Sequence, residues 1–425
     1  MNKKNRSRLE AFRQLRQEIR GSREYLIVGI DVAKDRHHAF FGTATGKTFL
    51  RRLVFKNDRE GFERLVIQTE ALQVAHGLGK VVYGMEPTAD YHKPLGEYLI
   101  REGYRVVLVS GRSVKRNREL LDGRWDKHDV KDSANVADLI SQGKCLYYEY
   151  PDERLRDLRG LLSLKRRLKK QERGLRVRIR NHLLAQYFPE LDRYLGPEGL
   201  AIVRWCLSPS RIAGLGYEEF ARMVALGRRH QSQQQRLRAI WEKASVSVGC
   251  KGGEGVDFEA RVMAEELRRV REVIKETDQE IETICLTFAD YPYLLTIPGF
   301  GPDVSSKVLG AIGDPFRFNK AAQVLKTAGL DLSAERRGTR SDRVVPVISK
   351  NGKSDLRYAL YQAAFVASTK NRDFMMWFTH KLQDRQREKG IQTKMRVKLA
   401  AKMLVIAWTL MKKKEAFSPN YLNLK

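Results

Sequence analysis

The chain has 425 residues, 42% of them hydrophobic, which exceeds one ordinary core and predicts two or three globular domains. Its 80 Lys and Arg outnumber its 51 Asp and Glu, so the formal net charge is +29 and we expect a polyanionic partner, above all nucleic acid. The four scattered cysteines exclude a disulfide framework and a cysteine-based zinc site, and the lack of a long apolar run predicts no membrane contact and a cytoplasmic location.

Residues 1–24 form a basic N-terminal extension that lacks the apolar core of a signal peptide. The spacing of its Leu and Ile residues predicts a short basic helix. We expect this helix to lie on nucleic acid or on a neighbouring subunit.

Two apolar strands of the next segment each end in a carboxylate. The run that starts at Tyr25 ends in Asp31 and predicts a buried strand, with a hairpin that returns along its edge. The run from Val81 ends in Glu86, where Pro87 stops the strand. A buried carboxylate is costly unless a cation neutralises it, and a divalent metal ion is the usual solution.

The elements around these strands complete an α/β domain over 25–150. Helical spacing is found over 58–79 and again over 92–102, and a third apolar strand follows. The basic stretch from 114 reads as a loop and then a helix. The order predicts an α/β sheet with an antiparallel edge.

The middle segment, 151–290, changes to long and very basic helices. Two such helices, separated by a Gly-rich break at 249–255, predict an antiparallel hairpin or a coiled coil for assembly and nucleic-acid binding. The insertion at about 190–245 has no assignable fold, and a helical linker with solvated faces remains an alternative reading.

The last segment, 291–425, predicts a mostly helical domain. Its opening, LLTIPGFGPDVSSKVLG, places two glycines around a Pro-Asp turn and resembles a helix-hairpin-helix element that binds phosphate without reading sequence. A polar loop, a short strand over Val344–Ile348, a helix from Ser354 and a helix over 394–413 follow.

Four carboxylates in this order suggest one metal centre. Asp129 and Asp132 are three residues apart on one helix face, where the two carboxylates repel each other. A bound cation would remove this repulsion and make the pair a binding site. Each acid alone also has a structural explanation, as a helix cap, a turn residue or an ion-pair partner. Asp126 is the neighbouring acid that could be a ligand in place of one of them. Together with Asp31 and Glu86 they match the oxygen ligands that hold two Mg²⁺ in phosphoryl transfer.

Several motifs resemble the DEDD transposases of the insertion sequence one-ten (IS-one-ten) family, which includes bridge-RNA-guided recombinases and Piv-type DNA invertases. They are GIDVAKD, GMEPTADYH, KHDVKDSANVADLI, IPGFGP and VPVISKNGKSDLRYAL, and they occur in the family's order over 25–150 and 290–370. The resemblance implies a RuvC-like, RNase H-type N-terminal fold with Asp31, Glu86, Asp129 and Asp132 as ligands of two Mg²⁺ or Mn²⁺ ions.

The same resemblance implies the partners. A coiled coil would assemble dimers and tetramers, a C-terminal transposase domain would follow it, and a structured non-coding RNA would pair with donor and target double-stranded DNA. It also implies a bacterial, nucleoid-associated protein.

One residue departs from the family pattern. Family members carry a nucleophilic serine before a glycine upstream of the ISK-x-G motif, but here Arg337 precedes Gly338. A guanidinium cannot serve as a nucleophile. Ser333, Thr339 and Ser341 are the nearby hydroxyls, although each also reads as an ordinary turn residue. The sequence leaves open whether the nucleophile has moved or has been lost.

The sequence therefore predicts a DNA transposase or site-specific recombinase that uses Mg²⁺-assisted transesterification. A metal-dependent junction resolvase or nuclease that uses water is the first alternative, and a strand-exchange-defective relative that only binds nucleic acid is the second. The residues expected to contact nucleic acid are Lys165, Arg166, Arg167, Lys169, Lys170, Arg173, Arg176, Arg178, Arg180, Arg336, Arg337, Arg340, Arg343, Lys350 and Lys353.

Overall fold

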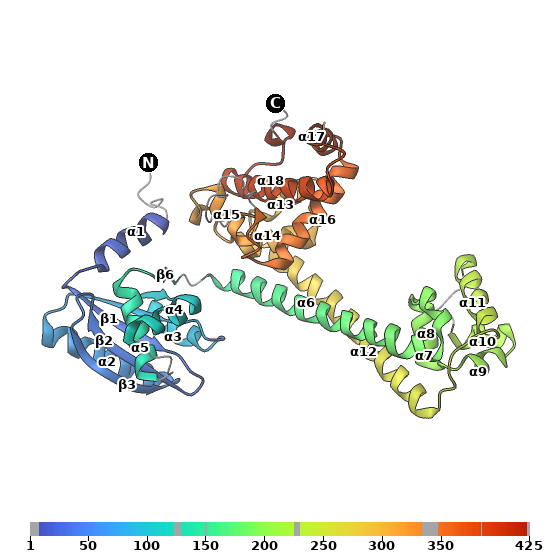
Figure 1. Cartoon of the computed structure of the whole chain (residues 1–425), viewed down its shortest axis with the longest axis horizontal. Coiled ribbons are helices and arrows are strands. Elements are labelled where there is room, and N and C mark those ends of the chain that lie inside the picture. Colours follow the sequence, from blue (N-terminus) through green and yellow to red (C-terminus); the bar gives the residue numbers. More distant parts are fainter. Residues whose placement is uncertain are drawn as a thin grey trace. The chain divides into compact units, whose positions relative to one another are not determined.

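The computed structural model describes residues 8–122, 129–148, 151–224, 230–333, 347–383 and 385–422. The chain divides into two compact units, drawn in Figure 1. The first unit contains Met1–Asp152 and Asp314–Gln323, and the second contains Glu153–Gly313 and Val324–Lys425.

A six-stranded sheet forms the centre of the first unit, in the order β3-β2-β1-β4-β5-β6. Strands β1, β4 and β5 are parallel, whereas β2, β3 and β6 pair antiparallel with their neighbours. This confirms the predicted α/β sheet with an antiparallel edge and adds β6 at the opposite edge. The strand bounds are β1 Tyr25–Asp31, β2 Arg36–Thr43, β3 Thr48–Lys56, β4 Lys80–Met85, β5 Arg105–Leu108 and β6 Leu146–Tyr147.

Helices cover both faces of this sheet. Helices α2 (Arg59–His76) and α3 (His92–Arg101) share a core with alternate residues of β1 such as Leu26 and Val28. Helices α1 (Arg8–Ile19), α4 (Gly111–Asp122) and α5 (Asp129–Ser141) pack on the other face, with Tyr25 and Ile27. Since α4 is helical from residue 111, the loop expected from residue 114 is wrong.

Helix α1 is the short helix predicted for the N-terminal segment, and it packs against its own unit. Leu15 and Ile19 are buried in the same core as Val82, and Glu18 accepts hydrogen bonds from Tyr25 at 2.9 Å and Arg105 at 3.1 Å. The apolar side of α1 is therefore covered by its own unit.

An antiparallel helical hairpin runs through the second unit. Helices α6 (Glu153–Arg178) and α12 (Glu254–Leu286) lie side by side in Figure 1. Their cross-links run in opposite order along the two helices, because Glu172 pairs with Arg271 and Arg178 pairs with Glu259. This confirms the predicted hairpin.

The insertion between these two helices is a small helical domain with its own core. Phe188, Leu191, Ile202, Phe220 and Leu237 are buried there together. The fold that the sequence left unassigned is therefore compact and is not a solvated linker. Its elements are η2 Ile179–Leu184, α7 Ala185–Tyr187, η3 Pro189–Tyr194, α8 Pro197–Trp205, α9 Pro209–Ala213, α10 Tyr217–Val224 and α11 Gln231–Ala244.

The C-terminal part is mostly helical, as predicted. Pro302 is the first residue of α14, so the Pro-Asp pair begins a helix and does not form the expected turn. The glycine that the bend requires is Gly299, with φ of +86° and a would-be Cβ 2.4 Å from the carbonyl oxygen of Ala363. The elements are α13 Tyr291–Leu295, α14 Pro302–Ile312, η4 Pro315–Arg317, α15 Ala321–Ala328, β7 Leu332–Ser333, β8 Val347–Ile348, α16 Ser354–Lys370, α17 Arg372–Leu382, α18 Ile391–Lys413 and η6 Pro419–Leu422.

Within the described residues, no helix has both the length and the apolar character needed to cross a membrane.

Candidate active site

Asp31 and Glu86 leave the sheet side by side. Strands β1 and β4 are parallel, and Ile30 of β1 is in register with Met85 of β4. Asp31 and Glu86 follow these two residues directly. The two carboxylates therefore lie at the same end of two adjacent strands, as the sequence predicted.

The alternation of side chains places Asp31 on the face that α5 covers. Val28 and Ile30 of β1 belong to the core beneath α2 and α3, whereas Ile27 belongs to the core beneath α5. Successive side chains of a strand point to opposite faces, so Gly29 and Asp31 share the α5 face with Ile27.

Two glycines in register allow α5 to lie directly on this face. Gly29 pairs with Gly84 across β1 and β4. A Cβ on Gly29 would lie 2.3 Å from the carbonyl oxygen of Ser133, and one on Gly84 would lie 2.2 Å from Cδ1 of Ile140. Because both positions lack side chains, α5 lies directly on the sheet, with the backbone of Ser133, the residue after Asp132, against Gly29.

Helix α4 approaches the same place through a third glycine. A Cβ on Gly111, the first residue of α4, would lie 2.7 Å from Oε1 of Glu86. The Glu86 side chain thus lies against the N-terminal turn of α4, where backbone N–H groups favour a negative charge.

Asp132 is buried and paired with a cation of α4. Its side chain is 5% exposed, and the Arg118 guanidinium lies 2.7 Å from its Oδ1. A polar network next to this pair joins the same two helices, since Nδ2 of Asn117 donates to Asn135 at 2.8 Å and to Asp138 at 2.7 Å. Sequence reasoning missed Arg118 and Asn117, because a basic stretch gives no signal for its buried partners.

Asp31 at the end of β1, Glu86 directly after β4 and Asp132 on α5 are carboxylates, and carboxylate oxygens suit a hard divalent ion. Among the described side chains, no group of three or more His, Cys, Asp or Glu lies close enough together to hold a metal ion. Asp129 is the first residue of α5, and its side chain lies outside the described residues. The four-carboxylate centre therefore remains a prediction.

Two buried histidines lie near the loops that follow the two strands. Nδ1 of His37, which is fully buried, accepts a hydrogen bond from the backbone N–H of Ala33 at 3.2 Å, just after Asp31. His92 is 7% exposed at the start of α3, after the Glu86 loop. Burial lowers the pKa of both imidazoles.

The two ends of the segment expected to carry the nucleophile meet in a short sheet. Ser333 of β7 pairs with Val347 of β8, and the Ser349 hydroxyl donates to Asp331 at 2.6 Å. The Ser333 side chain lies outside the described residues, as do the predicted residues Arg336, Arg337, Thr339, Arg340, Ser341 and Arg343. Lys350 and Lys353 follow β8 and are exposed.

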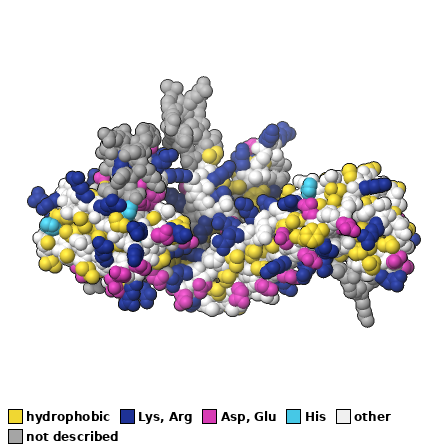
Figure 2. All heavy atoms as spheres, turned by 90° about the horizontal axis from the view of Figure 1, so that it is seen from below, with side chains coloured by type: hydrophobic (Ala, Val, Ile, Leu, Met, Phe, Trp, Pro, Cys, Tyr) yellow, Lys and Arg dark blue, Asp and Glu magenta, His cyan; other side chains and the backbone are white. Residues whose placement is uncertain are grey.

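Most of the predicted basic residues of α6 and η2 are exposed. These are Arg166, Arg167, Lys169, Lys170, Arg173, Arg176, Arg178 and Arg180. Lys169 pairs with Glu172, and Arg180 pairs with Asp192. Figure 2 shows Lys and Arg side chains over much of the described surface on one face of the molecule.

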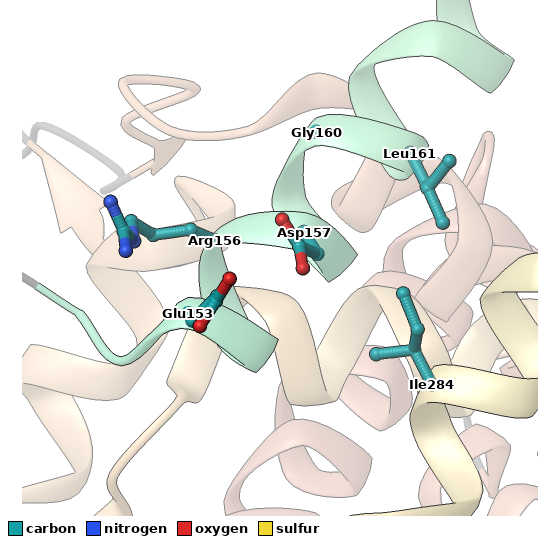
Figure 3. Close-up of a pocket in the computed structure, with 6 residues that line it drawn as sticks. All are labelled: Glu153, Arg156, Asp157, Gly160, Leu161 and Ile284. Carbon is teal, nitrogen blue, oxygen red and sulfur yellow. The ribbon is translucent and has the colours of Figure 1, made fainter.

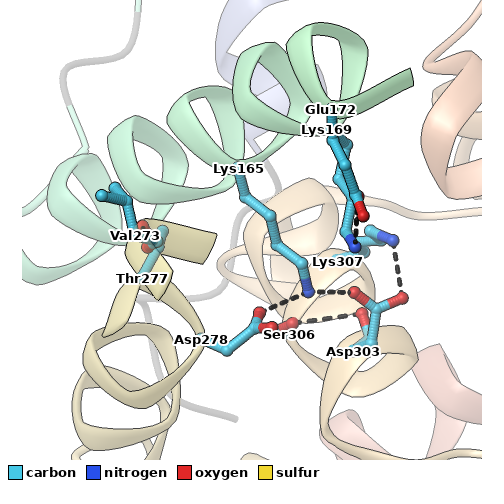
Figure 4. Close-up of polar contacts among 9 residues, drawn as sticks. All are labelled: Lys165, Lys169, Glu172, Val273, Thr277, Asp278, Asp303, Ser306 and Lys307. Atoms are coloured by element: carbon cyan, nitrogen blue, oxygen red, sulfur yellow. Dashed lines mark hydrogen bonds and ion pairs between the residues drawn. The ribbon is translucent and has the colours of Figure 1, made fainter. Parts of the chain in front are cut away.

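Lys165 is the exception among the α6 residues that were predicted to contact nucleic acid. Its side chain is 12% exposed, and its ammonium group lies 2.5 Å from Asp278 of α12 and 2.5 Å from Asp303 of α14 (Figure 4). Lys307 also binds Asp303, at 2.6 Å. Because Lys165 joins three helices through two carboxylates, its charge is not offered to a nucleic-acid backbone, and this corrects the expected role of Lys165.

A surface hollow between α6 and α12 offers no second active site. It has a volume of about 570 Å³ and is lined by Glu153, Arg156, Asp157, Gly160, Leu161 and Ile284 (Figure 3). Its two carboxylates are exposed, and no nucleophile lies among its lining residues.

Comparison with known proteins matches both ends of the chain to transposases. A family model described as a transposase, of the DEDD class of IS110, matches residues 28–189, and a second, described as the transposase IS116/IS110/IS902 family, matches residues 291–376. The insertion element IS110 uncharacterized 43.6 kDa protein of Streptomyces coelicolor is 25% identical over 398 residues, which are 91% of this chain and 94% of the relative. The insertion element IS116 uncharacterized 44.8 kDa protein of Streptomyces clavuligerus is 22% identical over 401 residues, or 92% and 96% of the two chains.

Proposed function

We propose that the chain, which belongs to the IS110 family of transposases, cuts and rejoins DNA with carboxylates of its first unit and a hydroxyl from the second unit of another subunit. The observation that carries this proposal is the registered pair of strand ends that brings Asp31 and Glu86 together on the face covered by α5.

The carboxylates act as ligands of divalent ions. Asp31, Glu86, Asp129 and Asp132 would hold two Mg²⁺ or Mn²⁺ ions, which when bound supply Lewis-acid stabilisation of the charge that develops on the phosphate. The chain itself contributes fixed positions, because β1 and β4 set two of the carboxylates and α5 sets the others. Arg118 holds the Asp132 carboxylate in orientation at 2.7 Å.

The nucleophile is a hydroxyl of Ser341, Thr339 or Ser333, supplied by another subunit. Its oxygen attacks the DNA phosphorus and forms a phosphoester, while the bond from phosphorus to the DNA 3′ oxygen breaks. The hydroxyl loses its proton to solvent, and the departing 3′ oxygen takes one up. The number of phosphoester bonds is unchanged, so rejoining needs no nucleotide hydrolysis.

Sequence recognition falls to a structured non-coding RNA that pairs with donor and target DNA. The net charge of +29 supports binding of two polyanions by one chain. The α6–α12 hairpin is the element through which we propose that dimers, and tetramers in the synaptic complex, assemble at the bacterial nucleoid.

One residue favours a second candidate. Arg337 stands where the family carries its serine. If no nearby hydroxyl replaces that serine, the same carboxylates would serve a nuclease or junction resolvase that uses water, or would remain in a relative that only binds nucleic acid.

The deciding experiment combines the purified chain and Mg²⁺ with the flanking non-coding RNA and with donor and target DNA. We expect a protein–DNA adduct that survives denaturation, maps by mass spectrometry to Ser333, Thr339 or Ser341, and disappears in Asp31→Ala. Cleavage without an adduct would establish the nuclease reading. Neither product from the natural chain, with both restored by Arg337→Ser, would establish that the serine has been lost from a recombinase scaffold.

A further inference from the structure

The loop that follows Asp31 is held mainly through its backbone. Among residues 32–35, Val32 is buried, and the other three side chains are exposed. Apolar packing therefore fixes only the first residue of the loop. The position of the rest depends on the partners that the backbone N–H and C=O groups find.

Two residues outside the loop make three hydrogen bonds to this backbone. Nδ1 of His37, on β2, accepts a hydrogen bond from the N–H of Ala33 at 3.2 Å. Asn57, directly after β3, donates from Nδ2 to the carbonyl oxygen of Lys34 at 3.0 Å and from its backbone N–H to that of Asp35 at 3.0 Å. Three consecutive residues of the loop are thus bound by groups of the two neighbouring strands.

The register of the sheet brings Asn57 to the loop. Arg36 of β2 pairs with Lys56 of β3 in an antiparallel ladder. The next pair outward in this ladder is Asp35 with Asn57, which lies where β2 begins and β3 ends. Because the loop starts directly after Asp31, the last residue of β1, a shift of the loop would be transmitted to the Asp31 carboxylate.

His37 is an unfavourable residue for packing alone. It is fully buried, and its ring centre lies 5.1 Å from that of Phe55 and 6.2 Å from that of Phe62. Among the described residues, Nε2 of His37 has no hydrogen-bond partner, and a buried polar atom without a partner costs free energy. A phenylalanine would make similar ring contacts without this cost. The specific contribution of the histidine is therefore the bond that Nδ1 accepts from Ala33.

We propose that His37 and Asn57 are positioning residues for Asp31. They hold the backbone of 33–35 in place, so that the Asp31 carboxylate keeps the orientation in which it binds a divalent ion. This inference rests on the proposed function, because it takes Asp31 as a metal ligand. Neither residue has to contact the ion, and residues that orient a ligand in this way typically change metal affinity 10- to 100-fold.

The test measures Mn²⁺ binding to the full-length chain without nucleic acid, by electron paramagnetic resonance at pH 8, where histidine is neutral. Only the binding that is lost in Asp31→Ala is compared, because surface carboxylates also bind Mn²⁺. His37→Phe keeps an aromatic ring and removes the acceptor of the Ala33 N–H. Asn57→Ala removes the side-chain bond to Lys34.

Asp58→Ala is the matched control. Asp58 follows Asn57 directly and caps α2, where its side chain accepts a hydrogen bond from the N–H of Gly61 at 2.8 Å. Loss of this cap should lower the Tm by about 2–4 °C and leave the three bonds to the loop intact. A change in Mn²⁺ affinity that comes only from destabilising the first unit would therefore occur in this variant as well.

We expect the dissociation constant for Mn²⁺ to rise about 10-fold in His37→Phe and in Asn57→Ala, and to keep its natural value in Asp58→Ala. The Tm of His37→Phe should stay equal or rise, which separates weaker metal binding from unfolding. A rise in one of the two variants alone confines the positioning role to that residue.

Natural Mn²⁺ affinity in both variants, or an equal loss in Asp58→Ala, overturns the inference and leaves Asp31 as a metal ligand. Mn²⁺ binding that is unchanged in Asp31→Ala refutes the metal chemistry of the proposed function, and the inference is then refuted with it.

Discussion

The Arg118 guanidinium of α4 lies 2.7 Å from the Asp132 carboxylate of α5, and both side chains are largely shielded from water. Arg118 therefore neutralises the carboxylate of one proposed metal ligand, and both residues belong to the first unit. Since α4 also begins against Glu86 at Gly111, one helix contacts two of the four candidate carboxylates.

Arg118→Gln should destabilise the first unit in EDTA. The substitution leaves a buried carboxylate without its cation, and breaking such a pair costs about 3 kcal/mol. Thermal unfolding measures the effect. If Asp132 is a metal ligand, Mg²⁺ should recover more of the Tm in the variant than it adds to the natural chain, because the ion takes over the charge of Arg118.

The matched control is Arg116→Gln, an exposed arginine two residues away on α4. It should change the Tm little in EDTA and show the natural response to Mg²⁺. If Mg²⁺ does not raise the Tm of Arg118→Gln, Asp132 is not a metal ligand.

Gly29→Ala should separate α5 from the sheet. The added methyl would lie 2.3 Å from the Ser133 carbonyl oxygen, a backbone atom that cannot move alone. We expect a loss of about 2–3 kcal/mol in the free energy of unfolding, together with loss of DNA cleavage. Gly79→Ala, where nothing lies within 4 Å, is the control and should leave both unchanged. Natural stability in Gly29→Ala would contradict the close approach of α5.

The buried histidines should make the first unit sensitive to acid. Burial lowers the pKa of His37 and His92 in the folded chain, so the unfolded chain binds protons more readily. The contribution of these two histidines to folding stability is complete above the histidine pKa of the unfolded chain, about 6.5. It is lost as the pH falls from there through their lower pKa values in the folded chain.

Chemical denaturation at a series of pH values checks this prediction. His37→Gln should flatten the loss between neutral and mildly acidic pH, whereas His230→Gln, at an exposed site, should leave the natural profile. If stability depends on pH in the same way in His37→Gln and in His92→Gln as in the natural chain, these imidazoles are not the cause of the acid sensitivity.

Lys165→Met should loosen the second unit without weakening nucleic-acid binding. It removes the ammonium that joins Asp278 and Asp303, leaves both carboxylates in place, and should cost about 2 kcal/mol. Arg173, on the same helix, is exposed. Its substitution Arg173→Gln should lower the affinity for nucleic acid and leave the Tm unchanged. Thermal unfolding and salt-dependent DNA binding are measured on both variants, and equal losses of affinity would restore Lys165 as a contact.

The order of strands and helices followed from local patterns. Apolar runs that end in Asp31 and Glu86 marked two adjacent buried strands, and Leu spacing marked the α6–α12 hairpin. The 190–245 insertion gave no such signal because its core is assembled from several helices, most of them nine residues or shorter. Helix α4 was read as a loop because its first turns are polar and basic, and its buried face carries Val114 with Asn117.

The sequence by itself determined that this chain is a basic α/β protein with two carboxylates at strand ends, since period and composition are properties of neighbouring residues. Only the tertiary structure decided how the site is assembled. Three contacts join residues that are distant in the chain. Gly29 is in register with Gly84, Arg118 pairs with Asp132, and Lys165 forms ion pairs with two carboxylates. Such contacts depend on the packing of α4, α5, α6, α12 and α14 against other elements, and no local pattern encodes a partner that the fold brings from elsewhere.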